Sequence, residues 1–210
     1  MNRIDPRIIK TKRQIDRALI ECLSRYPFQK ITVDMICAAS MINRSTFYKY
    51  YTDKYDLLDR YLARILDEFR AQSVVDFVLA SPTDVGSSAY KDSFERFARY
   101  LYQNRDTYFI LWNAVMERRV YDEMILIIKD KITDLLRETY PSLRGNDLYT
   151  GLYAYLFAAD AMTLIRWWFT NESSVTIQDV LRIMTQNMAE GLFRTFRENL
   201  IQPRQTPPGL

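Results

Sequence analysis

Histidine is absent from this chain of 210 residues. Its absence excludes His-based acid–base catalysis, Ser-His-Asp triads, Cys/His zinc fingers and His-ligated haem, because each of these sites needs an imidazole. The sequence also lacks a nucleophile motif and a glycine-rich phosphate loop. We therefore expect no catalytic residue, no metal site and no cofactor, and a helical ligand-binding enzyme is only a remote alternative.

Glycine and proline are few, with 5 and 7 residues, and no Asn-Gly pair marks a β-hairpin turn. Helix-favouring residues recur instead, which predicts an all-α fold. The two cysteines, Cys22 and Cys37, lie among apolar residues and match no metal or redox motif. They are expected to be reduced core thiols of a cytoplasmic protein.

The charge is unevenly distributed along the chain. Residues 1–60 hold 12 Lys or Arg and 7 Asp or Glu, whereas the remaining residues hold 17 and 19. A basic first quarter on a slightly acidic body indicates that the two parts meet different partners. The most apolar stretch, 151–169, contains Asp160 and Arg166, which are costly at the centre of a bilayer, so a buried helix is predicted there and no membrane partner.

Helical periodicity and capping residues predict about nine helices. Pro27 ends the first of them, and Thr32, Asn43 and Asp53 are placed to cap the next three. The predicted helices cover residues 13–26, 32–40, 44–50, 54–80, 89–103, 105–119, 121–139, 146–170 and 176–199.

Two short helices joined by a tight turn and packed on a first helix are typical of a helix-turn-helix DNA reader. The outward residues of the second short helix would be Arg44, Ser45, Tyr48 and Lys49, with Asn43 and Thr46 at its start. These side chains can meet base edges or phosphates. A solvated polar face of an all-α domain remains the alternative at this point. The basic residues ahead of the first helix, which could follow the DNA backbone or a minor groove, are Arg7, Lys10, Lys12 and Arg13.

Three stretches of the sequence closely resemble the signature of the tetracycline-repressor (TetR) family. They are ITVDMICAA at 31–39, NRSTFYKYY at 43–51 and DKYDLL at 53–58. The resemblance implies a homodimeric, all-α transcriptional regulator that binds double-stranded DNA at a palindromic operator. It divides the chain into a helix-turn-helix domain at 1–54, an effector-binding and dimerisation domain at 55–201, and a flexible tail at 202–210.

The resemblance also assigns DNA contacts to individual residues. Thr32 and Lys54 would hold phosphates at helix starts, where backbone amides favour anions. The full set of expected DNA-binding residues is Thr32, Asn43, Arg44, Ser45, Thr46, Tyr48, Lys49, Tyr50 and Lys54. Phe47 and Tyr51 have inward spacing and are expected to be packed. The family usually has Gly where Met41 stands, so either the turn is strained there or it is rearranged.

For the C-terminal part, the resemblance implies dimerisation through the last two long helices and an effector site between helices. Aromatic residues and one isolated carboxylate are the candidates for that site, although an aromatic stripe is more often explained by packing, and a satisfied core carboxylate is an equally good explanation of Asp160. The candidates are Phe97, Tyr100, Tyr108, Trp112, Tyr155 and Asp160. The expected function is a repressor released by a small molecule. An activator, or a regulator controlled by a protein partner without a small-molecule pocket, is the alternative.

Overall fold

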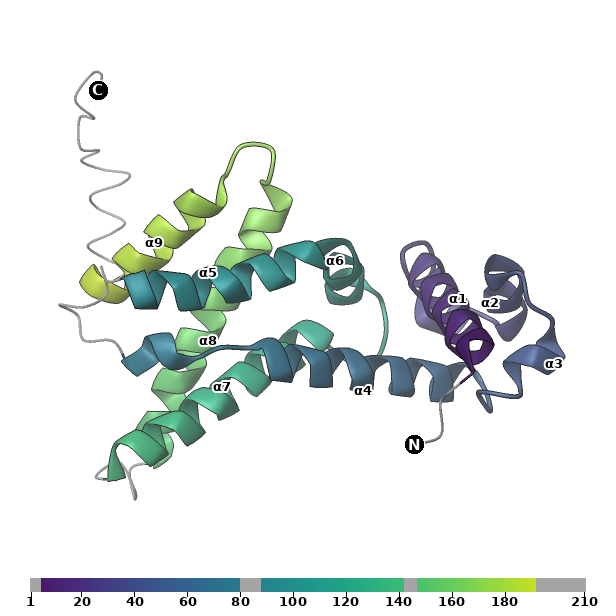
Figure 1. Cartoon of the computed structure of the whole chain (residues 1–210), viewed down its shortest axis with the longest axis horizontal. Coiled ribbons are helices and arrows are strands. Elements are labelled where there is room, and N and C mark those ends of the chain that lie inside the picture. Colours follow the sequence, from purple (N-terminus) through teal and green to yellow (C-terminus); the bar gives the residue numbers. More distant parts are fainter. Residues whose placement is uncertain (1–4, 80–87, 142–146, 192–210) are drawn as a thin grey trace. The chain divides into compact units, whose positions relative to one another are not determined.

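The computed structural model describes residues 5–79, 88–141 and 147–191 (Figure 1). Within these ranges the secondary structure is entirely helical, as the composition predicts. The elements are α1 (Pro6–Leu23), η1 (Phe28–Lys30), α2 (Val33–Ser40), α3 (Arg44–Phe47), α4 (Lys54–Gln72), η2 (Asp76–Leu79), α5 (Ser88–Gln103), α6 (Arg105–Asn113), α7 (Val120–Thr139), α8 (Asp147–Thr170) and α9 (Ile177–Glu190).

The chain forms two compact units. The first combines residues 1–72 with 104–124, and the second combines 73–103 with 125–210. Compactness thus groups α4 and α6 with the first three helices. The predicted boundary between the DNA-binding and effector-binding domains, at residues 54 and 55, is not tested by this grouping and stays a prediction. The predicted tail at 202–210 lies outside the described residues.

Helix boundaries follow capping side chains. Thr32 Oγ1 accepts a hydrogen bond from Met35 N at 3.2 Å, and Asn43 Oδ1 accepts one from Thr46 N at 3.2 Å, so both predicted caps are confirmed. Helix α1 begins at Pro6, seven residues earlier than predicted, because Asp5 accepts from the Arg7 amide and proline suits the first helical position.

Three predicted helices are shorter in the structure. The third ends at Phe47, where three turn residues follow, and the fourth ends at Gln72 rather than near residue 80. Helix α6 ends at Asn113 rather than at 119. Tyr51 beyond α3 and Val75 beyond α4 are buried, so the inward spacing continues past the ends of these two helices.

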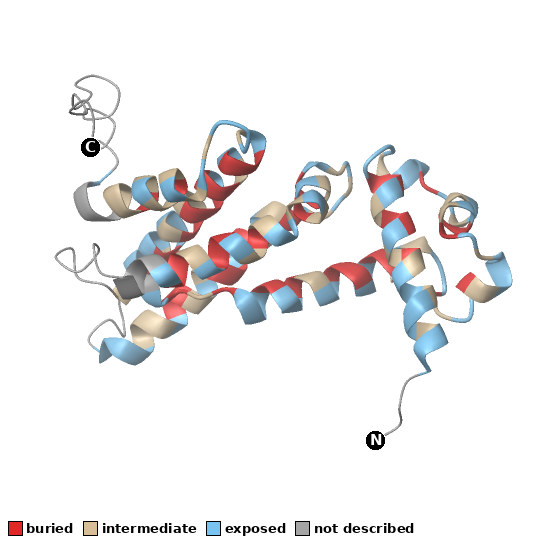
Figure 2. Ribbon diagram, turned by 45° about the horizontal axis from the view of Figure 1, so that its top comes forward, coloured by how far each residue is buried: buried red, intermediate tan, exposed pale blue. Residues whose placement is uncertain are grey.

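The core of the first unit consists of fully buried aliphatic and aromatic side chains. Figure 2 shows buried positions along one side of α4 and exposed positions along the other. The side chains with no exposed surface are Ile15, Leu19, Ile36, Phe47, Leu57, Leu62, Phe69 and Met124. Both cysteines are unpaired and buried, as expected.

The second unit is built from α5, the larger part of α7, α8 and α9. The faces of α8 differ: its buried side holds small and apolar residues, including Ala154, Ala158, Ala161 and Ile165. Among the described helices, α8 is long and apolar enough to span a membrane by length and composition alone. Its buried side agrees with the predicted core helix.

Met41 ends α2 in the left-handed conformation, with φ 55° and ψ 38°. It is the one non-glycine residue with positive φ among the described positions. The Met41 amide donates to Ala38 O, and the Ile42 amide donates to Cys37 O. These bonds close the helix end, so the turn keeps its tight geometry with methionine in place and is not rearranged.

Met41→Gly should stabilise the protein. A left-handed backbone costs a residue with a Cβ about 1–2 kcal/mol, and the greater freedom of glycine in the unfolded chain returns about half of this. The Met41 side chain is 91% exposed, so little packing is lost. We expect the free energy of unfolding to rise by about 1 kcal/mol in urea denaturation. Met41→Ala, which keeps the Cβ, is the control and should leave it nearly unchanged; an equal gain there would refute the backbone explanation.

Candidate nucleic-acid interface

The four-residue helix α3 is fixed at its start by Asn43. Besides capping the backbone, the Asn43 Oδ1 atom accepts hydrogen bonds from Ser45 Oγ at 3.0 Å and from Thr46 Oγ1 at 2.7 Å. A single side-chain oxygen thus accepts three hydrogen bonds from the first turn of the helix. Since a helix this short has no stability of its own, these contacts are needed to form it.

Phe47 fixes the rotation of α3 about its axis. Its side chain has no exposed surface, and its ring meets Tyr48 edge-on at 5.5 Å and Tyr51 at 5.6 Å. The predictions that Phe47 and Tyr51 are packed are confirmed. With Phe47 turned inward, the residues predicted to face outward are exposed: Arg44, Ser45, Tyr48 and Lys49.

Arg44 is held by a residue that the sequence analysis did not assign to the interface. Its Nε lies 3.3 Å from Asp34 Oδ1, across the turn from α2. The pKa of Arg44 is raised, first by a hydrogen bond to Tyr48 and then by the charge of Asp34. Both partners are largely exposed, so the pair contributes little stability but restricts the guanidinium. The position of Asp34 in the first turn of α2 gave no sign of this pairing, which depends on how α2 and α3 cross.

Lys54 has a different partner from the predicted phosphate. Its Nζ donates to the backbone oxygens of Phe28 at 3.0 Å, Gln29 at 3.0 Å and Ile31 at 2.8 Å. An ammonium has three donors, so all of them are engaged within the protein. Lys54 thus ties the start of α4 to η1 in this structure, and its expected phosphate contact stays a prediction. These hydrogen bonds could not be predicted from the sequence, because the acceptors are backbone oxygens 23 to 26 residues away.

The remaining predicted DNA contacts lie on the same unit. Thr32 and Asn43 are exposed caps, and Thr46 and Tyr50 are partly exposed. The Lys12 ammonium of α1 lies 5.8 Å from the centre of the Tyr50 ring. The basic residues of α1 that the sequence analysis placed beside DNA are all exposed, namely Arg7, Lys10, Lys12 and Arg13.

The residues predicted to bind an effector are divided between the two units. Tyr108 and Trp112 belong to the first unit, where their rings stack at 5.9 Å. Trp112 Nε1 donates to Met124 Sδ at 3.2 Å. Both side chains are buried, so packing accounts for them.

The other four candidates, Phe97, Tyr100, Tyr155 and Asp160, belong to the second unit. Phe97 is buried, whereas Tyr155 is exposed on α8. The Asn187 side chain donates to Asp160 Oδ1 at 3.3 Å, and burial raises the pKa of Asp160 above its usual range. Asn187 Oδ1 is buried and has no hydrogen-bond partner among the described residues.

The helix-turn-helix segment matches a known family. The profile of the bacterial regulatory proteins of the tetR family matches residues 15–61, which include α2, α3 and the start of α4. Residues 15–61 therefore form a DNA-binding domain of the TetR family. Members of this family are transcriptional regulators rather than enzymes, and their partner is DNA.

Solved structures share the fold of the whole chain at low sequence identity. A transcriptional regulator of Pseudomonas aeruginosa PAO1 is similar with a TM-score of 0.63 and 20% identity, over 93% of this chain and 97% of that chain. The fatty acid degradation regulator FadR of Bacillus halodurans gives 0.59 and 16%, over 87% and 96%. A TetR transcriptional regulator of Streptococcus agalactiae gives 0.54 and 22%, over 89% and 97%. No curated protein sequence matches significantly.

Lys54→Ala should destabilise the protein. It would leave backbone oxygens of Gln29 and Ile31 without their charged donor, and the expected loss is about 1–3 kcal/mol of unfolding free energy. Chemical denaturation measures this loss. Lys49→Ala is the matched control, because Lys49 is exposed and should leave stability within about 0.5 kcal/mol. Equal stability of the two variants would show that the hydrogen bonds of Lys54 to these backbone oxygens do not stabilise the fold.

Proposed function

We propose that this TetR-family chain is a homodimeric, sequence-specific repressor that an effector releases from a palindromic operator. The observation that carries the DNA-reading part is the fixed orientation of α3, with Phe47 buried and Arg44 restrained by Asp34 on the outside. In a helix-turn-helix, the start of the second helix meets base edges in the major groove. A restrained guanidinium there suits the bidentate recognition of guanine.

The proposed interface has two kinds of contact. Arg44 reads bases, while hydroxyl, amide and ammonium groups around it hold phosphates and set the register. Lys49 is the exposed cation of the turn after α3, and among the described residues it has no ion pair within 4 Å. The interface, without Lys54, comprises Thr32, Asn43, Arg44, Ser45, Thr46, Tyr48, Lys49 and Tyr50.

Substitutions at Arg44 and Lys49 should have different effects on DNA binding. Lys49→Ala should weaken binding to all sequences and lower the slope of log affinity against log salt by about 1, because one phosphate contact is lost. Arg44→Ala should reduce the preference for the operator over random DNA by about 1–3 kcal/mol. Fluorescence anisotropy over a salt series measures both quantities, using a site selected from genomic DNA fragments.

Arg96→Ala on α5 is the control for the loss of a surface cation outside the interface, and it should bind like the parent chain. Unchanged affinity, salt slope and sequence preference in both interface variants would rule out α3 as the DNA reader.

The dimer is proposed to form on the outer face of α8, together with α9. Large apolar side chains repeat on that face with spacings of three and four residues and stay exposed in the single chain. A continuous apolar face of this length marks an interaction site, and a second copy can bury it symmetrically. The exposed residues are Leu148, Tyr149, Leu152, Tyr153, Tyr155, Leu156 and Trp167.

The double variant Leu152→Glu/Leu156→Glu should dissociate the dimer. Two carboxylates per chain would lose water on association without gaining a partner, so the dissociation constant should rise by about 100-fold or more. Light scattering after size exclusion measures the mass at several concentrations. Leu126→Glu on α7 is the matched control, since Leu126 is also an exposed leucine, and it should remain dimeric. If the double variant stays dimeric, the dimer interface does not include this face of α8.

Effector release is the part of the proposal supported by the family resemblance. It assigns the effector to the domain at 55–201 and the DNA contacts to residues 1–54, in a cytoplasmic protein. An effector can act only through a difference in affinity between the DNA-bound and free states. Asp160, with its raised pKa and its amide partner, supplies the polar group of the second unit that is best suited to bind one.

A further inference from the structure

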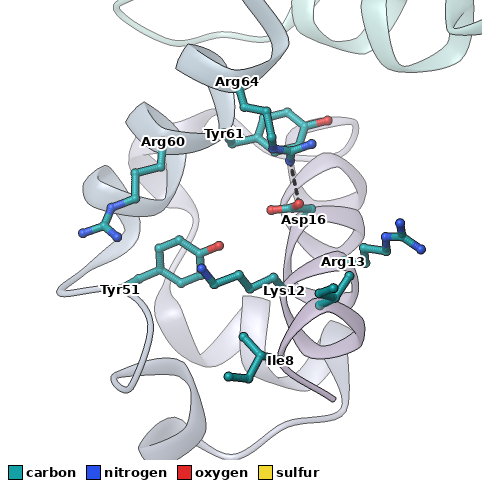
Figure 3. A pocket seen from close by; sticks show the side chains of 9 residues that line it. Ile8, Lys12, Arg13, Asp16, Tyr51, Arg60, Tyr61 and Arg64 are labelled. Carbon is teal, nitrogen blue, oxygen red and sulfur yellow. Dashed lines mark hydrogen bonds and ion pairs between the residues drawn. The ribbon is translucent and has the colours of Figure 1, made fainter. Parts of the chain in front are cut away.

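A hollow of about 380 Å³ lies between α1 and α4 in the first unit (Figure 3). Its walls carry Lys12 and Asp16 of α1, Tyr51 of the segment before α4, and Tyr61 and Arg64 of α4. These residues are outside the proposed DNA interface. At roughly 30 Å³ for each water, the hollow has room for a ligand of about a dozen non-hydrogen atoms.

Two tyrosines line this hollow, and their rings have neighbours: Phe47 packs on Tyr51, and the Arg64 guanidinium lies over Tyr61. Tyr51 and Tyr61 are each 7% exposed, and neither hydroxyl has a hydrogen-bond partner among the described residues. Burial raises the pKa of both phenols to about 12, with a smaller contribution from the charge of Asp16. They therefore stay protonated and can donate. Neither hydroxyl oxygen is among the buried atoms that lack a partner, so both face the open space of the hollow, where a ligand oxygen can accept from them.

The charges around the hollow favour an anion. It is lined by four cationic side chains and one carboxylate, and that carboxylate, Asp16, is already paired with Arg64 at 2.6 Å. Arg60 is paired with Asp56, and in Figure 3 both Arg13 and Arg60 point away from the centre. The Lys12 ammonium extends into the hollow and has no ion pair within 4 Å among the described residues.

From these contacts we infer that the hollow binds a small phosphate monoester, held by the Lys12 ammonium and the hydroxyls of Tyr51 and Tyr61. A phosphate offers three acceptor oxygens to these donors, and its charge matches the surplus of cations. Arg64 stays on Asp16 and prevents this carboxylate from repelling the ligand. Ile8 and Ile9 at the edge of the hollow provide apolar contact for the organic group.

Occupancy of this site weakens DNA binding, a step that rests on the proposed function. Lys12 lies over the ring of Tyr50, which belongs to the proposed DNA interface. A phosphate bound to Lys12 neutralises this positive charge beside the proposed interface, where the charge otherwise attracts the operator backbone. Because coupling between two ligands is reciprocal, operator DNA lowers the affinity for the phosphate by the same factor.

The binding step is tested with phenyl phosphate and the full-length chain, without DNA, by phosphorus NMR at constant ionic strength in chloride buffer. We expect saturable binding that weakens at least tenfold in the double variant Tyr51→Phe/Tyr61→Phe, which loses two hydroxyls and no ring. Tyr26→Phe, which alters an exposed tyrosine of the same unit, should bind like the parent chain. Absent saturation, or equal affinity in the double variant, would overturn the assignment whether or not α3 reads DNA.

A second measurement distinguishes a free phosphate ester from a phosphate of the DNA backbone. In phosphate-free buffer the double variant should bind the selected operator as the parent chain does, and saturating phenyl phosphate should weaken operator binding by the parent about fivefold or more. If the double variant itself loses operator affinity tenfold, the hollow takes a backbone phosphate and the small-ligand assignment is wrong. If saturating phenyl phosphate leaves the operator affinity of the parent chain unchanged, the proposed coupling between the hollow and DNA binding is refuted.

Discussion

The burial of Phe47 is the contact on which the DNA-reading surface depends. Helix α3 has four residues and cannot persist alone, so its existence and its rotation both come from anchoring this ring among Tyr48, Tyr51 and the core of the first unit. Once Phe47 points inward, the outward direction of Arg44 and Lys49 follows from helical geometry. The Asn43 cap closes the same turn from its other end.

The cations of the first unit are divided between structural and available roles. Arg60 and Arg64 are engaged by Asp56 and Asp16, and Lys54 by three backbone oxygens. Lys12 and Lys49 have no ion pair within 4 Å in the part of the chain that the structure describes. Net charge alone does not separate these groups, because each carries the same formal charge. The separation comes from which carboxylate or carbonyl oxygen lies within reach.

Two surfaces differ in the kind of partner they suit. The outer face of α8 is apolar and long, and covering it removes hydrocarbon from water without any directional bond. The hollow between α1 and α4 is small and lined mostly by cations. Two of its tyrosine hydroxyls have no acceptor among the described residues, so hydrogen-bond geometry selects the ligand there. In the proposed regulator, the apolar face of α8 forms the dimer and the cationic hollow changes the affinity for DNA. The two functions need not interfere, because one depends on apolar burial and the other on charge and hydrogen bonds.

The sequence by itself determined the helical class, the caps at Thr32 and Asn43, and the family, since all of these are local: propensity, side-chain capping and a motif within 47 matched residues. It also identified Phe47 as inward from spacing alone. Only the tertiary structure decided that Met41 adopts the left-handed conformation, that Asp34 restrains Arg44, and that Lys54 donates to backbone oxygens at η1. Tyr51 and Tyr61 likewise meet only when α4 packs on α1. Each of these depends on the distance between groups far apart in the chain or on the crossing of two helices, and residue spacing carries no information about either.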